Sequence, residues 1–460
     1  MCGIIGVSNH EEAANIAFLG LYALQHRGEE AAGIASYDGK NIHLTKNTGL
    51  VADAFDEASL KGLKGKTAIG HTRYSTTGSS NYKNIQPFLV THRNRPMAVS
   101  HNGNLTNTEA LYRKLEEDGS IFQTSMDSEI IVHLLAKTAR NGDMKKWFID
   151  VLLQLKGAYS LVFLVEDVIV GARDPHGFRP LCLGKIDNSY IITSESCALD
   201  LIRAEFIREI EPGEIIFIKG GKIESVFLPG REKVKKSHCI FENIYFARPD
   251  SEIFGDNVYQ VRKRLGAQLA REFPVEADFA MSIPDSGNYA AIGYAQELDL
   301  PYEVGIIRNH YIGRTFIQPS QFLRDFRVRV KLNPIRSVLK GKKIVIIEDS
   351  IVRGTTSRGR VEELRRAGAK EIHMRISCPP ITSPCFYGID FPSKQELIAA
   401  TKSVKEIAEF IKVDTLEYLS LEGMLKVMKN AGDFCDACFT GHYPVEVPTN
   451  KSKYLLEGAK

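Results

Sequence analysis

The chain has 460 residues, enough for about two to four domains. Its formal net charge is only +3, which gives no electrostatic indication of a nucleic-acid or anionic-membrane partner. There is no apolar run of about 18 residues and no signal-type start, so we expect a soluble, cytoplasmic protein that contacts no membrane. Eight cysteines are too sparse for a disulfide framework in a chain this long.

The first half of the chain, to about residue 228, is rich in short runs typical of β-strands. Examples are TAIGHTRYST, PMAVSHNG and YIITSES, and the opening run GIIGV predicts a buried strand. Helical spacing predicts helices over residues 15–25 and 128–139. Proline, glycine and a charge run at residues 228–236 indicate a linker. We therefore expect one domain over residues 2–230 and a second over residues 231–460.

Cys2 stands immediately before the first predicted strand. Removal of Met1 would leave Cys2 with a free α-amino group, whose reference pKa is roughly 7.7–8.0. One residue could then supply both the base and the nucleophile of a covalent reaction. A buried structural cysteine at the end of a strand is an equally good interpretation of this position taken alone.

Three further motifs favour the catalytic interpretation. HTRYSTTG contains Arg73, whose planar guanidinium suits a carboxylate, and SHNGNL places Asn102 beside Gly103. An asparagine amide and a glycine N–H can together form an oxyanion hole. SMDSEI places Asp127 at a helix start, where it could bind an ammonium group or simply cap the helix. Taken together, these groups suit glutamine as a substrate.

MCGIIGV, LQHRGEEAAGI, GHTRYSTTG, SHNGNL and MDSE resemble the class II glutamine amidotransferase domain, which is an N-terminal nucleophile hydrolase. The resemblance implies an αββα sandwich that hydrolyses glutamine through a thioester on Cys2. It implies an oxyanion hole formed by Asn102 and Gly103, and glutamine binding by Arg73 and Asp127. Only Met1 precedes the cysteine, so we expect maturation without self-cleavage.

The second half contains KKIVIIEDSIVRGTTSRG. This run predicts a buried strand at residues 344–347, two carboxylates at its carboxyl end, a Gly-Thr-Thr turn and a helix. Backbone N–H groups of residues 353–357 and the helix start can bind a phosphate. An acidic strand end followed by an ordinary helix cap is the alternative. A sugar phosphate suits this run, with its hydroxyls at the carboxylates and its phosphate at the turn. The predicted sugar-phosphate-binding residues are Glu348, Asp349, Ser350, Arg353, Gly354, Thr355, Thr356 and Ser357.

This run resembles the phosphoribosylpyrophosphate (PRPP) signature of type I phosphoribosyltransferases, which implies a parallel α/β sheet. With FENIYFARPDS, PDSGNYAAIGYA and RNHYIGRTFI, nearly the whole chain resembles the glutamine PRPP amidotransferase family. The implied reaction converts PRPP, glutamine and water to 5-phosphoribosylamine, glutamate and diphosphate, the committed step of purine synthesis. Glu348 departs from the aspartate that many relatives carry, which leaves the details of ribose contact open.

The same resemblance implies further properties. It places Mg²⁺ at Ser286, Glu348 and Asp349, and it makes residues 308–316 a loop that closes over PRPP. It also implies a sealed passage for ammonia, inhibition by purine nucleotides and a homotetramer.

A separate prediction concerns four of the cysteines. FCDACF contains one CxxC motif, which alone suits zinc, a redox pair or an iron–sulfur site. One branch of the family has a [4Fe–4S] cluster, and the flanking runs HCIFE, PCFYGID and CDACFTGHYP recur here. The resemblance therefore implies cluster ligands at Cys239, Cys385, Cys435 and Cys438, with Cys378 as a spare; zinc on the same thiolates is the alternative. Cys182 and Cys197 are predicted as core residues in strands.

Two other functions compete with this prediction. A glutamine-dependent sugar-phosphate aminating synthase would share the first half but would lack EDSIVRGTTS. A PRPP-sensing regulatory protein would share EDSIVRGTTS but would have no use for Cys2 and a glutamine site.

Overall fold

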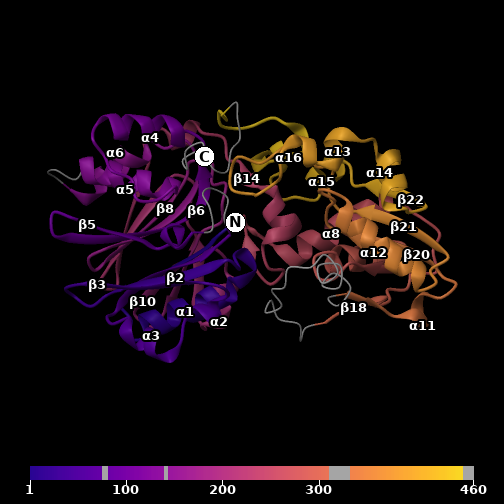
Figure 1. Ribbon diagram of the computed structural model, residues 1–460, viewed down its shortest axis with the longest axis horizontal. Helices are drawn as coiled ribbons and strands as arrows, with labels where there is room; N and C mark the ends of the chain where they lie inside the picture. The colour runs from indigo at the N-terminus through magenta and orange to yellow at the C-terminus, as the bar shows by residue number, and fades with distance from the viewer. Residues whose placement is uncertain (75–80, 139–142, 310–331, 449–460) are drawn as a thin grey trace.

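The chain folds into two unlike parts that lie side by side along its longest axis (Figure 1). The computed structural model describes residues 1–74, 81–138, 143–309 and 332–448. None of the helices in these ranges combines the length and the apolar character that a membrane crossing requires.

The first part contains two antiparallel sheets stacked face to face. In spatial order, one sheet consists of β11 (Glu205–Glu209), β9 (Cys182–Ile186), β10 (Ser189–Thr193), β1 (Gly3–Ser8), β4 (Thr67–Arg73), β2 (Ala31–Tyr37) and β3 (Ile42–Thr48). The other consists of β13 (Lys222–Phe227), β12 (Glu214–Lys219), β8 (Val168–Arg173), β7 (Gly157–Val165), β6 (Arg95–Leu105) and β5 (Phe88–His92). Fully buried side chains such as Ile4, Ile69 and Val162 fill the space between the sheets.

Helices cover the two outer faces of this sandwich. On the β1 sheet lie α1 (Ala13–Ala23), α2 (Val51–Ala54), α3 (Glu57–Gly62) and α7 (Cys197–Leu201). On the β6 sheet lie α4 (Thr108–Glu117), α5 (Asp127–Thr138) and α6 (Met144–Leu152). The predicted αββα sandwich is therefore confirmed, and α1 and α5 correspond to the two predicted helices. Cys197 is buried as predicted, but it begins α7 rather than lying in a strand, because β10 already ends at Thr193.

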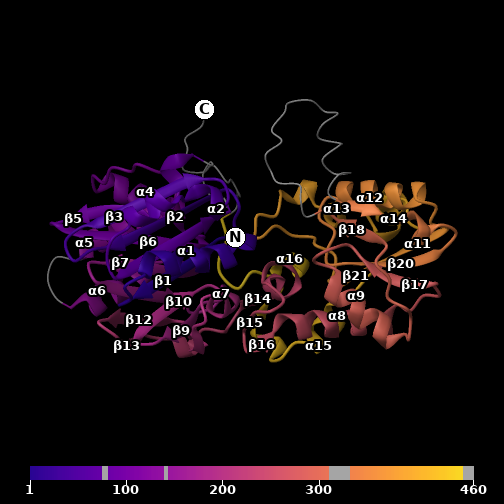
Figure 2. The same cartoon turned by 90° about the horizontal axis from the view of Figure 1, so that it is seen from below.

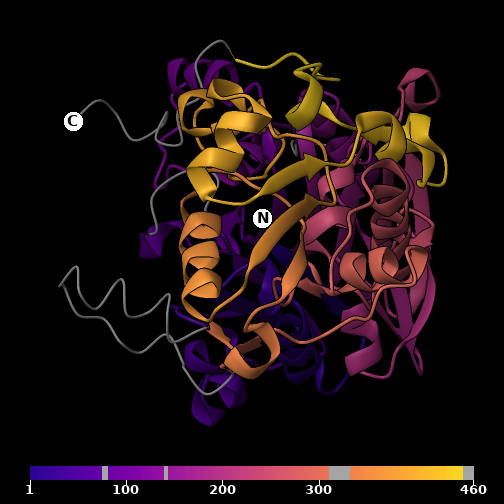
Figure 3. The same ribbon diagram turned by 90° about the vertical axis from the view of Figure 1, so that its right-hand side faces the viewer.

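The second part is built on a parallel sheet. Its strands, in spatial order, are β17 (Phe279–Ser282), β20 (Lys343–Glu348), β21 (Glu371–Ile376) and β22 (Thr415–Tyr418). The helices α8 (Val258–Glu272) and α9 (Asn288–Glu297) cover one face, while α12 (Thr355–Arg366) and α14 (Val404–Ile411) cover the other (Figure 2, Figure 3). Because both faces are covered, the interior of β20 is apolar without alternation. The predicted parallel α/β sheet is confirmed.

Short elements surround this sheet. The paired strands are β14 (His238–Cys239) with β23 (Phe434–Cys435), β15 (Glu252–Ile253) with β16 (Asp256–Asn257), and β18 (Ile306–Arg308) with β19 (Leu332–Pro334). The short helices are α11 (Arg336–Leu339), α13 (Ile398–Thr401), α15 (Leu421–Lys426) and α16 (Ala437–Thr440). The predicted linker at residues 228–236 contains one 3₁₀ turn, Arg231–Lys233. The domain limits at residues 230 and 231 stay a prediction.

Candidate active site

Cys2 is half-buried and directly precedes β1. Its backbone N–H donates to Oδ1 of Asn102 at 3.2 Å, and Nε of Arg27 donates to its carbonyl oxygen at 2.9 Å. Its Sγ donates to the carbonyl oxygen of Tyr74 at 3.6 Å. The nitrogen that removal of Met1 would convert to an α-amine therefore faces Asn102.

Asn102 and Gly103 lie in β6, opposite Ser160 and Tyr159 of β7. Nδ2 of Asn102 is buried and has no hydrogen-bond partner within the part of the chain that the structure describes. Gly103 has φ +154°, and a Cβ there would lie 2.1 Å from the carbonyl oxygen of Ala158, so only glycine fits. A buried amide donor beside a glycine N–H is the arrangement that an oxyanion hole requires.

Arg73 and Asp127 are both almost fully buried beside these residues. Arg73 ends β4; its Nη1 donates to the carbonyl oxygen of Asn84 and lies 3.7 Å from Sδ of Met126, the residue before Asp127. Oδ2 of Asp127 accepts from the backbone N–H of Leu105 at 3.1 Å. The structure thus brings all the motif residues of the first half together.

His101 also belongs to this site, although the sequence motifs gave no role to it. Its Nδ1 lies 3.2 Å from Oδ1 of Asp127. Burial opposes the charge on each side chain, but the attraction and hydrogen bond between them lower the pKa of Asp127 and raise the pKa of His101.

A buried group of charges fixes the backbone of Cys2. The guanidinium of Arg27 is fully buried; its Nη1 donates to Glu195, and its Nη2 donates to Glu242 at 2.8 Å. Burial opposes the charge of Arg27, but the two glutamates together raise its pKa. Glu195 belongs to the sandwich, whereas Glu242 belongs to the second half of the chain. Arg27 therefore joins Cys2 to both parts of the molecule.

In the second half, β20 places the predicted carboxylates at its carboxyl end. Gly354 has φ +74° and begins α12, which follows the loop from Asp349. Burial raises the pKa of Asp349, against the opposing effect of Ser286 close to it. Both residues line one cavity, so two residues of the predicted Mg²⁺ site lie together.

Glu348 has a partner that the sequence did not reveal. Arg360, two turns into α12, forms an ion pair with Oε1 of Glu348, and the hydroxyl of Ser357 donates to Oε2 at 3.1 Å. Burial raises the pKa of Glu348 to about 7, against the opposing effect of Arg360. The longer glutamate side chain is thus directed toward α12 by two hydrogen bonds.

One cavity of about 790 Å³ lies at the carboxyl end of β20 and reaches Tyr74 at the edge of the first site. It is lined by Tyr74, whose carbonyl oxygen contacts Sγ of Cys2, and by Arg308. Every residue predicted to bind PRPP also lines it, as does Ser286. Residues 310–316 of the predicted closing loop lie outside the described residues.

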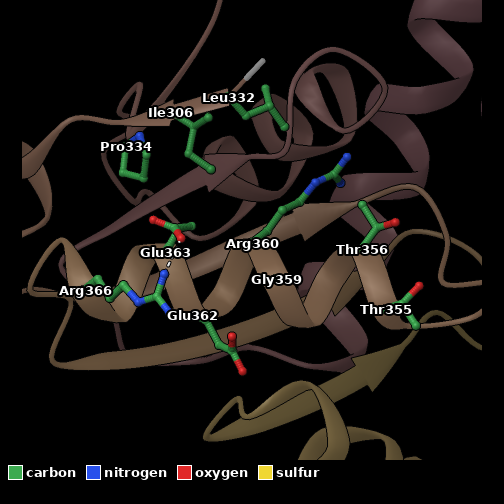
Figure 4. A pocket seen from close by; sticks show the side chains of 10 residues that line it. All are labelled: Ile306, Leu332, Pro334, Thr355, Thr356, Gly359, Arg360, Glu362, Glu363 and Arg366. Carbon is green, nitrogen blue, oxygen red and sulfur yellow. Dashed lines mark hydrogen bonds and ion pairs between the residues drawn. The ribbon is translucent and has the colours of Figure 1, made fainter. Parts of the chain in front are cut away.

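A second pocket of about 370 Å³ lies along α12, from Thr355 to Arg366 (Figure 4). Its lining includes Ile306 of β18 and Pro334 of β19, opposite the helix. It shares Thr355, Thr356 and Arg360 with the larger cavity, so the same turn of α12 faces both.

The four predicted cluster ligands come from segments that contact one another. Cys239 and Cys435 are opposite each other in the β14–β23 ladder. The carbonyl oxygen of Cys438 accepts from the backbone N–H groups of Thr382 and Ser383, shortly before Cys385. Chain segments far apart in sequence therefore bring these cysteines to one region.

These thiols also affect one another electrostatically. Burial raises the pKa of Cys239 to about 11, and burial together with the neighbouring thiols raises the pKa values of Cys435 and Cys438. Among the described residues, no group of three or more His, Cys, Asp or Glu side chains is arranged as a ready metal site. Buried thiols that raise each other's pKa nevertheless fit a soft metal centre, which would neutralise their thiolates.

Comparison with known proteins agrees with this geometry. The family model described as glutamine amidotransferase domain matches residues 71–201. The amidophosphoribosyltransferase of Archaeoglobus fulgidus is 49% identical over 454 residues, which cover 97% of this chain and 99% of that protein.

Two solved structures are similar over nearly the whole chain. A structure of the allosteric regulatory enzyme of purine biosynthesis has a TM-score of 0.94 and 46% identity, and covers 100% of this chain and 99% of its own. Glutamine PRPP amidotransferase from B. subtilis, complexed with ADP and GMP, has a TM-score of 0.92 and 46% identity, covering 98% of this chain and 99% of its own. The chain therefore belongs to the amidophosphoribosyltransferase family, which transfers ammonia from glutamine to PRPP in the first step of purine synthesis.

Proposed function

We propose that residues 2–230 hydrolyse glutamine and that residues 231–460 add the released ammonia to PRPP. The observation that carries this division is the cavity that extends from Tyr74, next to the Cys2 thiol, to the loop after Glu348. Free ammonia would be protonated in bulk water and would lose its nucleophilicity. If this cavity extended to the glutamine site and closed when both substrates are bound, it would prevent this loss.

In the first half, Cys2 acts as the nucleophile. After removal of Met1, its α-amine accepts the proton of the thiol, and Sγ attacks the amide carbon of glutamine. Nδ2 of Asn102 and the N–H of Gly103 donate to the oxyanion. Arg73 and Asp127 bind the α-carboxylate and the α-ammonium group of glutamine.

In the second half, the backbone N–H groups of residues 353–357 and the start of α12 bind the 5-phosphate of PRPP. The carboxylates at the end of β20 bind ribose hydroxyls. Ser286, Glu348 and Asp349 would hold Mg²⁺, which neutralises the departing diphosphate. Two buried carboxylates whose pKa values are raised by burial fit a divalent cation, because its charge would offset the cost of their ionisation.

We further propose that Cys239, Cys385, Cys435 and Cys438 hold a structural [4Fe–4S] cluster, which cross-links distant segments. Neither half-reaction transfers electrons, so the cluster would have no redox role. Since a relative was solved with ADP and GMP, we propose that purine nucleotides inhibit this enzyme too. A cytoplasmic homotetramer completes the proposal, and size-exclusion chromatography with light scattering tests its mass.

The decisive experiment mixes glutamine, PRPP and Mg²⁺ with the full chain and measures glutamate and diphosphate together. We expect the two products in equal amounts, and little glutamate without PRPP. An aminating synthase would instead form glutamate with a sugar phosphate and would release no diphosphate. A regulatory protein would bind PRPP without forming either product.

A further inference from the structure

The turn after Cys385 contacts the strand that carries the proposed oxyanion hole. Nδ2 of Asn104 donates to the carbonyl oxygen of Phe386 at 3.0 Å, across 282 positions of sequence. A Cβ on Gly388 would lie 3.2 Å from both the carbonyl carbon and the carbonyl oxygen of Gly103. Residues 386–388, which we call the 386–388 turn, therefore lie directly against the Gly103 peptide.

Tyr387 anchors this turn by contacts with each of its polar groups. Its N–H donates to Sγ of Cys385 at 3.3 Å, and its carbonyl oxygen accepts from Nε of Arg179 at 2.9 Å. Its hydroxyl donates to the carbonyl oxygen of Val445 at 2.7 Å, and its ring stacks on Phe178 with the centroids 4.3 Å apart. Because Tyr387 is also buried, the turn has little freedom to shift.

The position of Gly388 in the turn requires glycine for two reasons. Its φ of +105° is disfavoured for residues with a side chain. A Cβ would also press on the Gly103 backbone and lie 3.3 Å from Nη2 of Arg179. Glycine thus allows the second half of the chain to support the oxyanion strand by direct backbone contact.

Arg179 extends this support toward the nucleophile. Besides contacting Tyr387, its Nη1 lies 3.3 Å from Oε1 of Glu242. Glu242 also binds Arg27, whose Nε donates to the carbonyl oxygen of Cys2. All the charged side chains of this series are fully buried. The 386–388 turn and Cys2 are therefore fixed by one connected group of contacts.

We propose that the 386–388 turn positions the Gly103 peptide for glutamine hydrolysis, with Tyr387 and Gly388 as its positioning residues. The inference rests on the proposed role of Asn102 and Gly103 in stabilising the oxyanion. Donors to an oxyanion act only at the correct distance, and a shift of about 1 Å can cost roughly 10²-fold in rate. Residues of the second half thus set the rate of the reaction in the first half.

The first test is Gly388→Ala in the full-length protein. We expect kcat for glutamine hydrolysis to fall by up to about tenfold, because the new methyl group would push the Gly103 peptide by a fraction of an ångström. KM for glutamine should change little, since Arg73 and Asp127, the proposed glutamine-binding residues, belong to β4 and α5 rather than to the strand of Gly103. Synthesis from external ammonia should stay within about twofold of wild type, because the PRPP loop is unchanged.

Gly341→Ala is the matched control. Gly341 also has a left-handed φ, +75°, but a Cβ there would meet no atom within 4 Å. It reproduces the backbone strain without the contact, so we expect it to lower thermal stability without changing the ratio of glutamine-dependent to ammonia-dependent rates. The iron content of every variant is measured as well. A variant that keeps its iron but loses glutamine hydrolysis has a displaced turn and an intact metal site.

Asn104→Ala provides a second test that adds no bulk. It removes the hydrogen bond to Phe386, and we expect glutamine hydrolysis to slow three- to tenfold, roughly the value of one hydrogen bond. Synthesis from external ammonia should again change little. If Gly388→Ala does not fold, this variant alone tests whether the 386–388 turn positions the Gly103 peptide. Equal losses of both activities, or unchanged hydrolysis, would overturn the inference. Hydrolysis that persists in Cys2→Ala would instead overturn the proposed function.

Discussion

Nδ1 of His101 lies 3.2 Å from Oδ1 of Asp127, and both side chains are buried at the start of α5. Despite the burial, which disfavours both charges, each residue stabilises the charged form of the other. His101 immediately precedes Asn102, so this pair also fixes one end of the proposed oxyanion hole. His101 thus favours the ionised form of Asp127, which is the form that would bind the ammonium group of a substrate.

The pair predicts a pH dependence of stability. Because the pKa of His101 is raised on folding, its contribution is present below about pH 6.5 and is lost as the pH rises through the higher folded value. The lowered pKa of Asp127 gives a contribution present above about pH 4 and lost as the pH falls through the folded value. We expect urea midpoints of the wild type to fall between pH 6 and pH 8.5 more steeply than those of His101→Gln. Parallel midpoints in the two proteins would contradict the charge pair.

The motifs located the residues that we propose to touch substrates, but not the residues that hold them in position. Asn102 and Gly103 lie in a largely buried strand, and Asp349 directly follows one. Such patterns can be recognised in the sequence because strand periodicity and turn chemistry depend on neighbouring residues. Arg27 stands in the quoted run LQHRGEEAAGI, yet its partners Glu195 and Glu242 lie 168 and 215 positions away. Nothing in a local pattern encodes such a pairing, which depends on how the two parts pack.

The same limit applies to the second half. The run EDSIVRGTTSRGR contains both Glu348 and Arg360, but their pairing depends on the rotation of α12 relative to β20, which the sequence alone does not show. The strand-like run YIITSES predicts a strand at Cys197, whereas β10 ends at Thr193 and Cys197 begins α7.

Cys2→Ala tests whether the first half hydrolyses glutamine while the second half adds ammonia to PRPP. We expect glutamine-dependent synthesis to fall by at least roughly 10³-fold, because the thiol forms the covalent intermediate. Synthesis from high concentrations of ammonium salt should persist, since the transferase site does not use the thiol. Steady-state rates with each nitrogen source measure this, and wild-type consumption of glutamine by the variant would exclude Cys2 as the nucleophile.

Asp349→Asn tests the PRPP site. Neutralising one of the two carboxylates at the end of β20 should abolish synthesis from glutamine and from ammonia alike, because both line the proposed PRPP cavity. Glutamine hydrolysis without PRPP should keep its low basal rate, because Cys2 and its neighbours are untouched. Diphosphate release measures the first outcome and glutamate formation the second. Normal ammonia-dependent synthesis would show that Asp349 has no part in PRPP binding.

The Glu348–Arg360 pair predicts a stability coupling. Arg360→Met removes the cation beside the nearly buried carboxyl of Glu348. Because burial already raises the pKa of this carboxyl to about 7, it takes up a proton in the variant, and we expect a loss of about 1 kcal/mol in the free energy of unfolding, the value of one hydrogen bond. The double variant Glu348→Gln/Arg360→Met should be about as stable as Arg360→Met alone, because neither variant leaves a buried charge unpaired. Urea denaturation of the wild type, both single variants and the double variant gives the coupling energy. Additive losses would show that the two side chains act independently.

The last prediction concerns iron. We expect the anaerobically purified protein to be brown and to contain roughly four irons per chain, as one [4Fe–4S] cluster on four thiolates requires. Cys385→Ser should lose the iron, because it removes one ligand. Cys378→Ser should retain it: Cys378 is fully buried, and its Sγ donates to the carbonyl oxygen of Pro379 at 3.3 Å. The two variants are matched, since each exchanges one sulfur for oxygen in the same part of the chain.

The consequence of losing the cluster follows from where its ligands lie. Cys239 and Cys435 pair two strands that are only two residues long, and such a ladder contributes little stability by itself. Ligation would therefore add much of the stability of this region, and exposure to oxygen should bleach the protein and unfold it before Cys2 is modified. Metal analysis, absorbance and mass spectrometry of Cys2 over the same time course measure these events. Stoichiometric zinc instead of iron, or loss of iron from Cys378→Ser but not from Cys385→Ser, would show that the ligands are wrongly assigned.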